Sequence, residues 1–231
     1  MSLTILYQDK HLIAVNKPAG QLVHPADHPR PDDEVTMKIL RDQIGQEVSP
    51  LHRIDRPTSG AVLFGLDKET NTLMFQQFQQ KKVQKIYHAL VRGVPQHNHW
   101  VCRKPLQKKP NAPLQQAETE FKTLKTIRNP KLRSYADNLG DHLTLIEASP
   151  ITGRYHQIRK HLAHINFPII GDYLYADIDL CDQIGNLLKT GTRMLLQSNS
   201  LTFTHPHTKE PLTINSPKEP LLEKLGLYPM G

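Results

Sequence analysis

The sequence predicts an α+β fold built on a mostly antiparallel sheet. Segments with the apolar pattern of β-strands outnumber segments with the period of an amphipathic helix. The connections between them have the composition of turns and loops, and not of the regular helical crossovers that join parallel strands. A length of 231 residues is enough to bury a sizeable core. We therefore expect one domain over residues 1–231, with a long mixed sheet flanked by helices and loops.

The first elements of the chain are predicted to be a hairpin, a loop and a helix. Two short apolar runs, residues 5–7 and 12–15, flank a polar tetrapeptide and are typical of a β-hairpin. Residues 21–33 are rich in proline and histidine and predict a loop. Apolar residues then recur at helical spacing as far as Ile44, and Gly45 provides a stop for that helix.

The middle of the chain predicts a buried strand followed by a capped helix. Residues 61–66 form a continuous apolar run, and Asp67 can cap the helix that follows it. Residues 86–91 predict the next strand. Residues 95–116 are rich in proline, lysine and glutamine and predict a mobile loop or insertion.

The remaining elements are predicted from the same patterns. In chain order they are strands at 117–127 and 143–148, a helix with Ile158, Leu162 and Ile165 on one stripe, a polar loop after Asp172, a strand near 194–203 and a short helix near 221–225.

The composition of the chain favours a polyanionic partner. Lysine and arginine total 29 against 22 aspartate and glutamate residues, which gives a formal net charge of +7. Such an excess is typical of proteins that meet nucleic acid, although many basic proteins bind none. No apolar run approaches the ~18 residues of a membrane span, and the N-terminus lacks the pattern of a signal peptide. We therefore expect a cytoplasmic protein.

The densest polar cluster lies at residues 52–60. Asp55 stands between Arg53 and Arg56, whose positive charges favour the ionised carboxylate. Pro57 and the glycine at the end of the cluster predict a tight turn that would hold this carboxylate at the mouth of a sheet. Asp55 is thus a candidate nucleophile or base. A purely structural turn with an Asp–Arg pair remains the alternative.

A second polar cluster lies at residues 152–161. If this segment is helical, His156, Arg159 and Lys160 lie within one turn of each other. They could bind a phosphate or fix a carboxylate. The alternative is a solvated basic face on an amphipathic helix.

The sequence predicts neither a metal nor a cofactor. Two cysteines are too few and too far apart for a zinc ribbon or a disulfide framework. The closely spaced histidine pairs lack a third partner at a diagnostic spacing, and these pairs are His97/His99, His161/His164 and His205/His207. The nucleotide-binding and hydrolase motifs GxxxxGK[ST], GxGxxG and GxSxG are absent.

Four motifs in order resemble those of one enzyme family. Residues 52–60, HRIDRPTSG, resemble the HRLDxxTSG signature of the RluA-type pseudouridine synthases, with Ile54 in place of leucine. Residues 16–24 resemble the family's KPxG…VH motif, residues 85–93 its KxYxAxVxG segment, and residues 152–172 its TGRxHQIRxH…PIxGD block. Four motifs in the family's order are far more specific than any one of them.

This resemblance implies the pseudouridine synthase catalytic fold and the isomerisation of uridine to pseudouridine in RNA. The N1–C1′ bond breaks, the uracil turns, and C5 bonds to C1′ without a cofactor or metal. By the same resemblance Asp55 would be the catalytic carboxylate, acting through a covalent or a glycal intermediate. Tyr87 would stack on the target base and could take a sugar proton. Arg159 would pair with Asp55 and keep it ionised.

Further residues of the motifs are implied to contact RNA. Arg53 would fill the gap that the flipped uridine leaves in the helix stack, since flipping costs unstacking energy. The other implied RNA-binding residues of the motifs are Lys17, His52, Arg56, Arg154 and His156.

The resemblance is strongest to a branch of the family that acts on tRNA. We therefore expect a uridine near the T-stem as the target, with 23S ribosomal RNA as the alternative substrate. A non-catalytic RNA-binding or chaperone protein is the hypothesis from another class, and the intact set of Asp55, Tyr87 and Arg159 argues against it. The chain leaves no room before Leu3 for an S4-like domain, and we expect a monomer.

Overall fold

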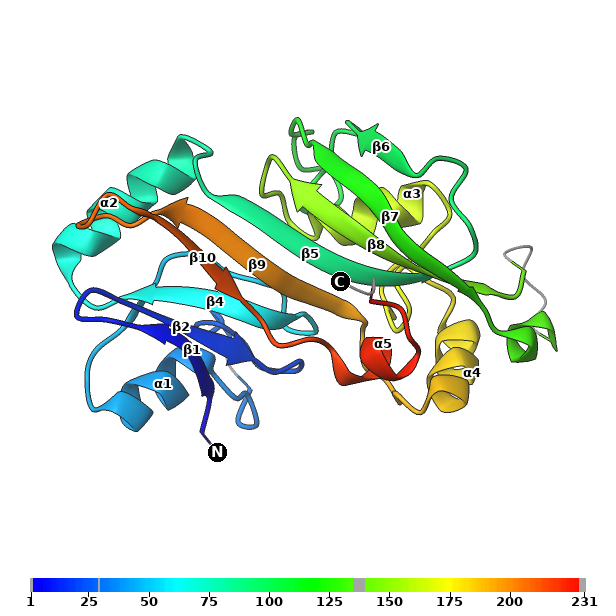
Figure 1. Ribbon diagram of the computed structural model, residues 1–231, viewed down its shortest axis with the longest axis horizontal. Coiled ribbons are helices and arrows are strands. Elements are labelled where there is room, and N and C mark those ends of the chain that lie inside the picture. The colour runs from blue at the N-terminus through cyan, green and yellow to red at the C-terminus, as the bar shows by residue number, and fades with distance from the viewer. Residues whose placement is uncertain (1, 29, 135–139, 229–231) are drawn as a thin grey trace. The chain divides into compact units, whose positions relative to one another are not determined.

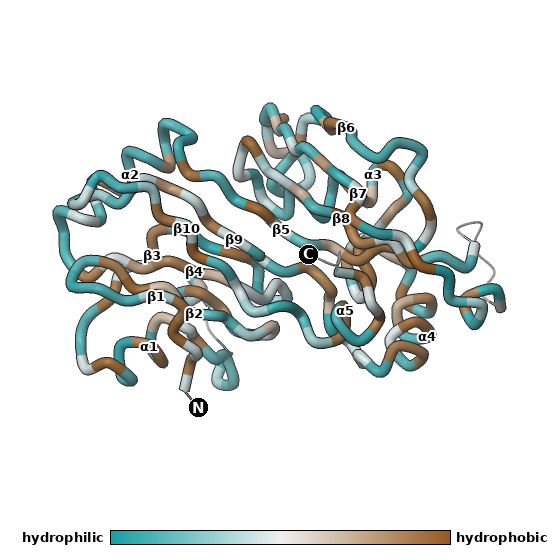
Figure 2. Tube along the Cα trace, in the orientation of Figure 1, coloured by the Kyte–Doolittle hydropathy of each residue, from teal (hydrophilic) through white to brown (hydrophobic). Residues whose placement is uncertain are grey.

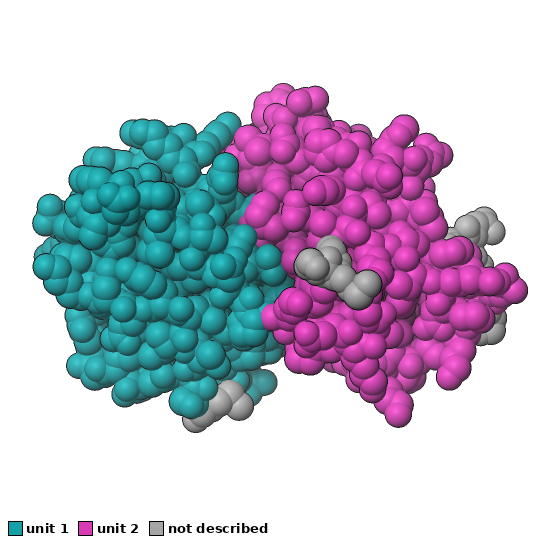
Figure 3. All heavy atoms as spheres, in the orientation of Figure 1, with its two compact units in different colours: residues 1–85, 197–217 teal, residues 86–196, 218–231 magenta. Residues whose placement is uncertain are grey.

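The computed structural model describes residues 2–28, 30–134 and 140–228, which divide into two compact units. Unit 1 comprises residues 1–85 and 197–217, and unit 2 comprises residues 86–196 and 218–231 (Figure 3). Two of the three boundaries fall within strands, β5 (Gln84–Arg92) and β9 (Leu196–Thr204), and the third lies between residues 217 and 218. Each unit is described by itself.

Unit 1 is a mixed sheet with two helices (Figure 1). Its strand order is β1-β2-β4-β9, with β10 on β9 and β3 on β4. The strands besides β9 are β1 (Thr4–Gln8), β2 (Leu12–Lys17), β3 (Ser49–Pro50), β4 (Ser59–Gly65) and β10 (Pro211–Asn215). The pairs are antiparallel except β4 with β9, which is parallel. The predicted hairpin is confirmed, because β1 pairs with β2.

The predicted stop of the first helix of unit 1 and the predicted start of the second are confirmed. Helix α1 (Thr36–Ile44) ends at Gly45, whose φ of 67° is left-handed and whose N–H donates to the Arg41 carbonyl. Helix α2 (Lys68–Gln79) begins after Asp67, which accepts a hydrogen bond from the Thr70 N–H. Met74 of α2 is buried in a core with residues of β2, β4 and β9.

Unit 2 is an antiparallel sheet with a second hydrophobic core. The strand order is β5-β8-β7-β6, where β6 is His99–Cys102, β7 is Thr119–Arg128 and β8 is His142–Pro150. Its helices are the 3₁₀ helix η1 (Pro130–Ser134), α3 (Gln157–His164), α4 (Ile178–Leu188) and α5 (Pro220–Lys224). Leu90, Leu145 and Ile184 belong to the core, so strands and α4 pack together.

Helix α4 corrects the prediction of a polar loop after Asp172. Asp177 caps it by accepting from the Leu180 N–H, and its buried face includes Cys181, Ile184 and Leu188. In Figure 2 the helix carries both hydrophobic and hydrophilic residues. The aspartates on the exposed face of this helix interrupt its apolar residues, so the helical period is hard to recognise in the sequence. The period becomes clear in the structure, where the apolar residues pack against the unit 2 core.

The segment 95–116, predicted to be a mobile loop or insertion, contains regular pairing. Strand β6 pairs with β7, and Leu106 forms an isolated bridge with Gln115. The mobility of this segment stays a prediction. The short strands β6 and β10 were not anticipated from the sequence.

The fold class is α+β, as the sequence predicts, with mixed and mostly antiparallel strand pairing. In the part of the chain that the structure describes, no helix is long and apolar enough to cross a membrane.

Candidate active site

Asp55 lies in a tight turn of unit 1 directly before a buried strand. The Thr58 N–H donates to the Asp55 carbonyl at 3.0 Å, which closes the turn over Arg56 and Pro57. Strand β4 then begins at Ser59. Asp55 itself is half-buried and Arg53 is exposed. The predicted tight turn at the mouth of the sheet is confirmed.

Gly60 fixes where this turn joins the sheet. Its φ of +111° disfavours any residue with a side chain, and a Cβ there would lie 2.2 Å from the Ser198 carbonyl oxygen. Gly60 pairs with Ser198 where β4 runs parallel to β9. The backbone position after the Asp55 turn therefore requires glycine.

Arg56 ties the Asp55 turn to the loop after β2. Its Nε donates to the Gly20 carbonyl at 2.8 Å, and its own carbonyl accepts from the Gly20 N–H at 2.8 Å. Its Nη1 forms an ion pair with Asp33 at 3.0 Å. These contacts hold two of the motif segments against each other within unit 1.

Lys17 is fully buried and also joins the loop after β2 to the Asp55 turn. Its Nζ donates to the carbonyls of Pro18 and Gln21 at 2.8 Å each and to that of Arg56 at 3.2 Å. Burial lowers the pKa of this ammonium to about 7, although the charge of Asp55 opposes the shift. Lys17 thus lies inside unit 1, whereas the expected RNA contact needs an accessible side chain.

His52 packs into the same region as a neutral ring. Its Nε2 accepts from the Leu63 N–H at 3.1 Å, and its ring lies 5.6 Å from that of Phe78. Burial lowers its pKa to about 3, and the positive charge of Lys85 adds to the shift. The Nε2 that would face RNA is therefore already engaged with β4.

Arg159 lies on α3 in unit 2 and forms a buried ion pair. Its Nε and Nη2 donate to the Asp172 carboxylate at 2.8 and 2.7 Å, and the side chains are only 6% and 0% exposed. The guanidinium carbon also lies 5.1 Å from the centre of the Tyr175 ring. Asp172 belongs to a motif of the resemblance but was given no role. The pairing of Arg159 with Asp55 stays a prediction.

Gln157 holds the segment before α3 in an irregular conformation. Its Oε1 accepts from the Thr152 hydroxyl at 2.7 Å and from the Arg154 N–H at 3.0 Å. Its Nε2 donates to the Glu118 carbonyl and the Thr119 hydroxyl, both at 2.9 Å. Sequence reasoning missed this role, because Thr119 at the start of β7 and Glu118 just before it lie 38 and 39 residues away.

His156 lies outside the helix, which corrects the prediction of one helical turn with Arg159 and Lys160. It has a left-handed φ of 54° and precedes α3. Its ring stacks on Tyr155 with 3.6 Å between centroids, and its Nδ1 lies 2.9 Å from the Tyr175 hydroxyl. The three side chains consequently differ in environment, with only Arg159 deeply buried among them.

The two remaining candidates also lie in unit 2. Tyr87 lies on β5 opposite Ala148 of β8 and is 8% exposed. Arg154 is exposed, and its Nε donates to the Gln116 carbonyl at 3.0 Å.

In the described residues one group of His and Asp side chains could hold a metal ion, and it consists of His11, Asp67 and His207.

Comparisons with known proteins identify relatives along nearly the whole chain. A family model described as RNA pseudouridylate synthase matches residues 11–164. The tRNA pseudouridine synthase C of Haemophilus ducreyi is 41% identical over 233 residues, covering 94% of this chain and 91% of the relative. The protein of the same name from Vibrio cholerae is 37% identical, with coverage of 93% and 90%.

Solved structures share the fold at low sequence identity. Human RNA Pseudouridylate Synthase Domain Containing 1 superposes with a TM-score of 0.74 at 22% identity, covering 94% of this chain and 84% of that chain. Human RNA Pseudouridylate Synthase Domain Containing 4 gives a TM-score of 0.71 at 23% identity, with coverage of 96% and 93%.

Proposed function

The chain belongs to the RNA pseudouridylate synthase family, and we propose that it converts one uridine of a transfer RNA to pseudouridine. Relatives with the printed name tRNA pseudouridine synthase C are about 40% identical over nearly their full length, which supports tRNA as the substrate. The observation that carries the chemistry is the Asp55 turn, which presents a half-buried carboxylate at the start of β4. Modification of tRNA would place the protein in the cytoplasm.

In the proposed reaction Asp55 supplies the carboxylate that assists cleavage of the N1–C1′ bond. The detached uracil turns, C5 bonds to C1′, the proton on C5 leaves to solvent, and N1 takes up a proton in its place. Atoms and electrons balance within the nucleotide apart from this proton exchange, so the isomerisation uses no redox partner.

We assign supporting roles to Tyr87 and Arg159. Tyr87 would contact the uracil with its ring and serve as the base that takes a sugar proton. Arg159 would stabilise the ionised Asp55, and its ion pair with Asp172 would hold the guanidinium in one orientation. A planar guanidinium held by two parallel hydrogen bonds has little rotational freedom.

The exposed arginines are the candidates for RNA contact. Arg53 lies two residues before Asp55 and is exposed, so we propose that it fills the space of the flipped nucleotide. Arg154 is exposed before α3 and would contact phosphate. His156, whose ring stacks on Tyr155, lies two residues further along the chain and would also contact the RNA. Lys17, His52 and Arg56 instead act as positioning residues, since their polar atoms bind the backbone of unit 1.

Mapping of pseudouridine in cellular RNA tests the proposed substrate. RNA from a strain that lacks this protein is compared with RNA from the same strain complemented with the intact gene. We expect one pseudouridine near the T-stem of tRNA to disappear on deletion and return on complementation. Loss of a site in 23S ribosomal RNA alone would replace the tRNA proposal. Retention of every site would favour the non-catalytic RNA-binding hypothesis.

A further inference from the structure

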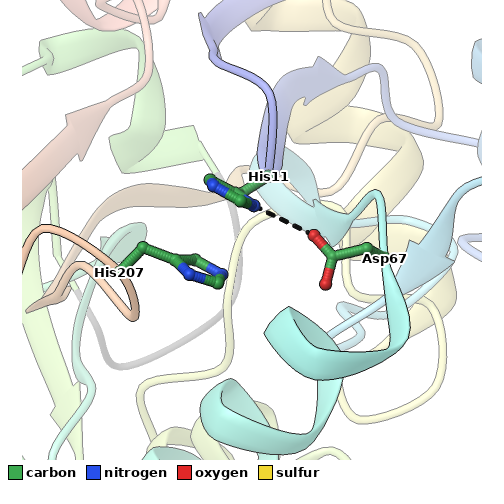
Figure 4. A group of neighbouring side chains, drawn as sticks. All are labelled: His11, Asp67 and His207. Carbon is green, nitrogen blue, oxygen red and sulfur yellow. Dashed lines mark hydrogen bonds and ion pairs between the residues drawn. The ribbon is translucent and has the colours of Figure 1, made fainter.

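A cluster of metal-ligating side chains lies in unit 1 outside the catalytic motifs. His11 follows β1, Asp67 precedes α2, and His207 lies in the turn between β9 and β10 (Figure 4). One ligating atom from each residue lies within 4.8 Å of the other two. The three residues are half-buried, so the site is accessible to an ion from solvent.

Hydrogen bonds direct one imidazole at the Asp67 carboxylate and the other at the neighbouring Thr70 hydroxyl. His11 Nδ1 lies 3.1 Å from Asp67 Oδ2. The Thr70 hydroxyl donates to the same oxygen at 2.7 Å and lies 2.9 Å from His207 Nε2. Since a hydroxyl has one proton, His207 Nε2 donates to Thr70 in this arrangement. Two ring N–H groups therefore converge on the Asp67–Thr70 pair.

We propose that His11, Asp67 and His207 form a binding site for Zn²⁺. Two imidazole nitrogens and one carboxylate oxygen are ligands that this ion accepts, and water would take the fourth position.

A second pair of residues fixes the two turns that carry the histidines. Asp9 Oδ1 accepts from the backbone N–H groups of His11 and Leu12 at 2.8 and 2.7 Å. Asp9 Oδ2 lies 2.8 Å from His205 Nε2. The other nitrogen of His205 accepts from the backbone N–H of His207 at 3.3 Å. The Asp9–His205 pair thus holds the backbones of both imidazole ligands. Residues outside the ligand set commonly support a metal site by positioning its ligands.

Ion binding requires the two imidazole rings to reorient. A tetrahedral ion about 2.0–2.2 Å from each ligand atom holds those atoms roughly 3.4 Å apart. The rings of His11 and His207 now stack at 3.6 Å and 14°, so their in-plane lone pairs do not meet at one point. Rotation about the soft χ2 torsion of one histidine corrects this. Each ring proton moves to the other ring nitrogen, so that the imidazole stays neutral and offers its lone pair to the ion.

The site would join three segments that are distant in sequence. Sequence reasoning predicts no metal, because the pair of His205 and His207 has no third ligand nearby along the chain. The fold supplies the missing ligands from His11 and Asp67. An ion there would stabilise unit 1, since metal bound only by the folded state lowers its free energy.

Titration of the metal-free full-length chain with Zn²⁺ tests the proposal. We expect calorimetry to show one tight equivalent and the melting temperature to rise with Zn²⁺ concentration. Asp67→Asn keeps a good helix cap and removes the charged ligand. His207→Gln removes a nitrogen ligand. Loss of a residue outside the ligand set lowers metal affinity by about 10- to 100-fold. Each of these two ligand substitutions should lower the Zn²⁺ affinity by more than that. His97→Gln, at an exposed histidine outside the cluster, should leave the affinity unchanged.

Replacement of Zn²⁺ by Co²⁺ gives a second readout. The intact protein should show the visible absorption of a tetrahedral cobalt site, and Asp67→Asn should lose it while its circular dichroism stays native. Binding that survives both substitutions, or that His97→Gln weakens equally, would overturn the proposal, as would the absence of a tight equivalent. In those cases His11, Asp67 and His207 form a hydrogen-bonded cluster only.

Discussion

Asp172 shows how one buried carboxylate can fix the orientation of an arginine. It accepts both hydrogen bonds from Arg159 and a third from the Leu174 N–H at 3.2 Å. The arginine can therefore change orientation only by breaking a buried ion pair. Removing one partner of such a pair is costly, because it leaves an uncompensated charge away from water.

We expect Asp172→Asn to destabilise the protein by about 3–5 kcal/mol and to lower kcat more than RNA affinity. The amide cannot compensate the Arg159 charge. Urea unfolding gives the free energy, and single-turnover kinetics with a tRNA transcript separates chemistry from binding. Asp42→Asn is the control, because Asp42 pairs with Arg41 in an exposed bridge, which contributes only about 0–1 kcal/mol. Equal losses in the two variants would contradict a special role for Asp172.

The candidate site residues could be recognised from their neighbours in the sequence. Their hydrogen-bond partners could not, because these lie far away along the chain. The turn around Asp55 could be predicted because arginine, proline and glycine surround it within a few residues. The burial of Lys17 could not, because its carbonyl acceptors include that of Arg56, 39 residues away. Arg159 was recognised from its motif, but its bond to Asp172 depends on the fold of the following loop.

At the scale of elements, the join between β4 and β9 places the Asp55 turn. Parallel pairing is limited to Ser59 with Gln197 and Gly60 with Ser198, so few hydrogen bonds define it. Gly60 allows the two backbones to approach closely. A larger residue at this position would displace β4 where it leaves the turn.

We expect Gly60→Ala to destabilise the protein by more than Gly45→Ala does. Both glycines have positive φ, which costs alanine about 1–2 kcal/mol. A Cβ at Gly45 meets nothing within 4 Å, whereas one at Gly60 meets the backbone of Ser198. Chemical denaturation of the two variants measures the combined cost of the close approach and of the φ of +111°, which lies outside the left-handed region that Gly45 occupies. Equal destabilisation would show that β4 and β9 can separate there without loss.

Most elements could be predicted because their patterns are local. Helix α2 has both a capping aspartate and an apolar stripe, and it begins where predicted. Helix α4 also has a capping aspartate, but Asp179 and Asp182 interrupt the apolar residues that follow. The short strand β10 has five residues, and only its pairing with β9 defines it.

At the scale of the whole molecule, buried neutral histidines should limit stability in acid. Burial lowers the pKa of His52 to about 3 and that of His88 to about 4, and it also lowers that of His161. Because the unfolded chain binds these protons below about pH 6.5, unfolding is favoured as the pH falls from 6.5 towards 3.

We expect the free energy of unfolding to fall with pH in that range, and His52→Gln to reduce the slope by up to about 1.4 kcal/mol per pH unit. Glutamine can still accept from the Leu63 N–H but does not titrate. Urea unfolding at several pH values measures the slope. His97→Gln, at an exposed site, should leave it unchanged. An unaltered slope in His52→Gln would show that His52 protonates readily in the folded protein.

We expect the net charge of +7 to serve RNA binding and the Asp55 turn to serve catalysis. The positive charge attracts the RNA backbone, and its contribution weakens as salt screens it. We propose that the Asp55 carboxylate carries the isomerisation. Substitution of the carboxylate should therefore separate catalysis from binding.

The most direct test measures tritium release from tRNA labelled at C5 of uridine, using wild-type protein and Asp55→Asn. The substitution keeps the shape of the side chain and removes its charge. We predict that Asp55→Asn releases no tritium while its affinity for tRNA, measured by filter binding, stays within about twofold of the wild type. Asp42→Asn, at an exposed position, should retain full release. Substantial release by Asp55→Asn would contradict the assignment of Asp55 as the catalytic carboxylate.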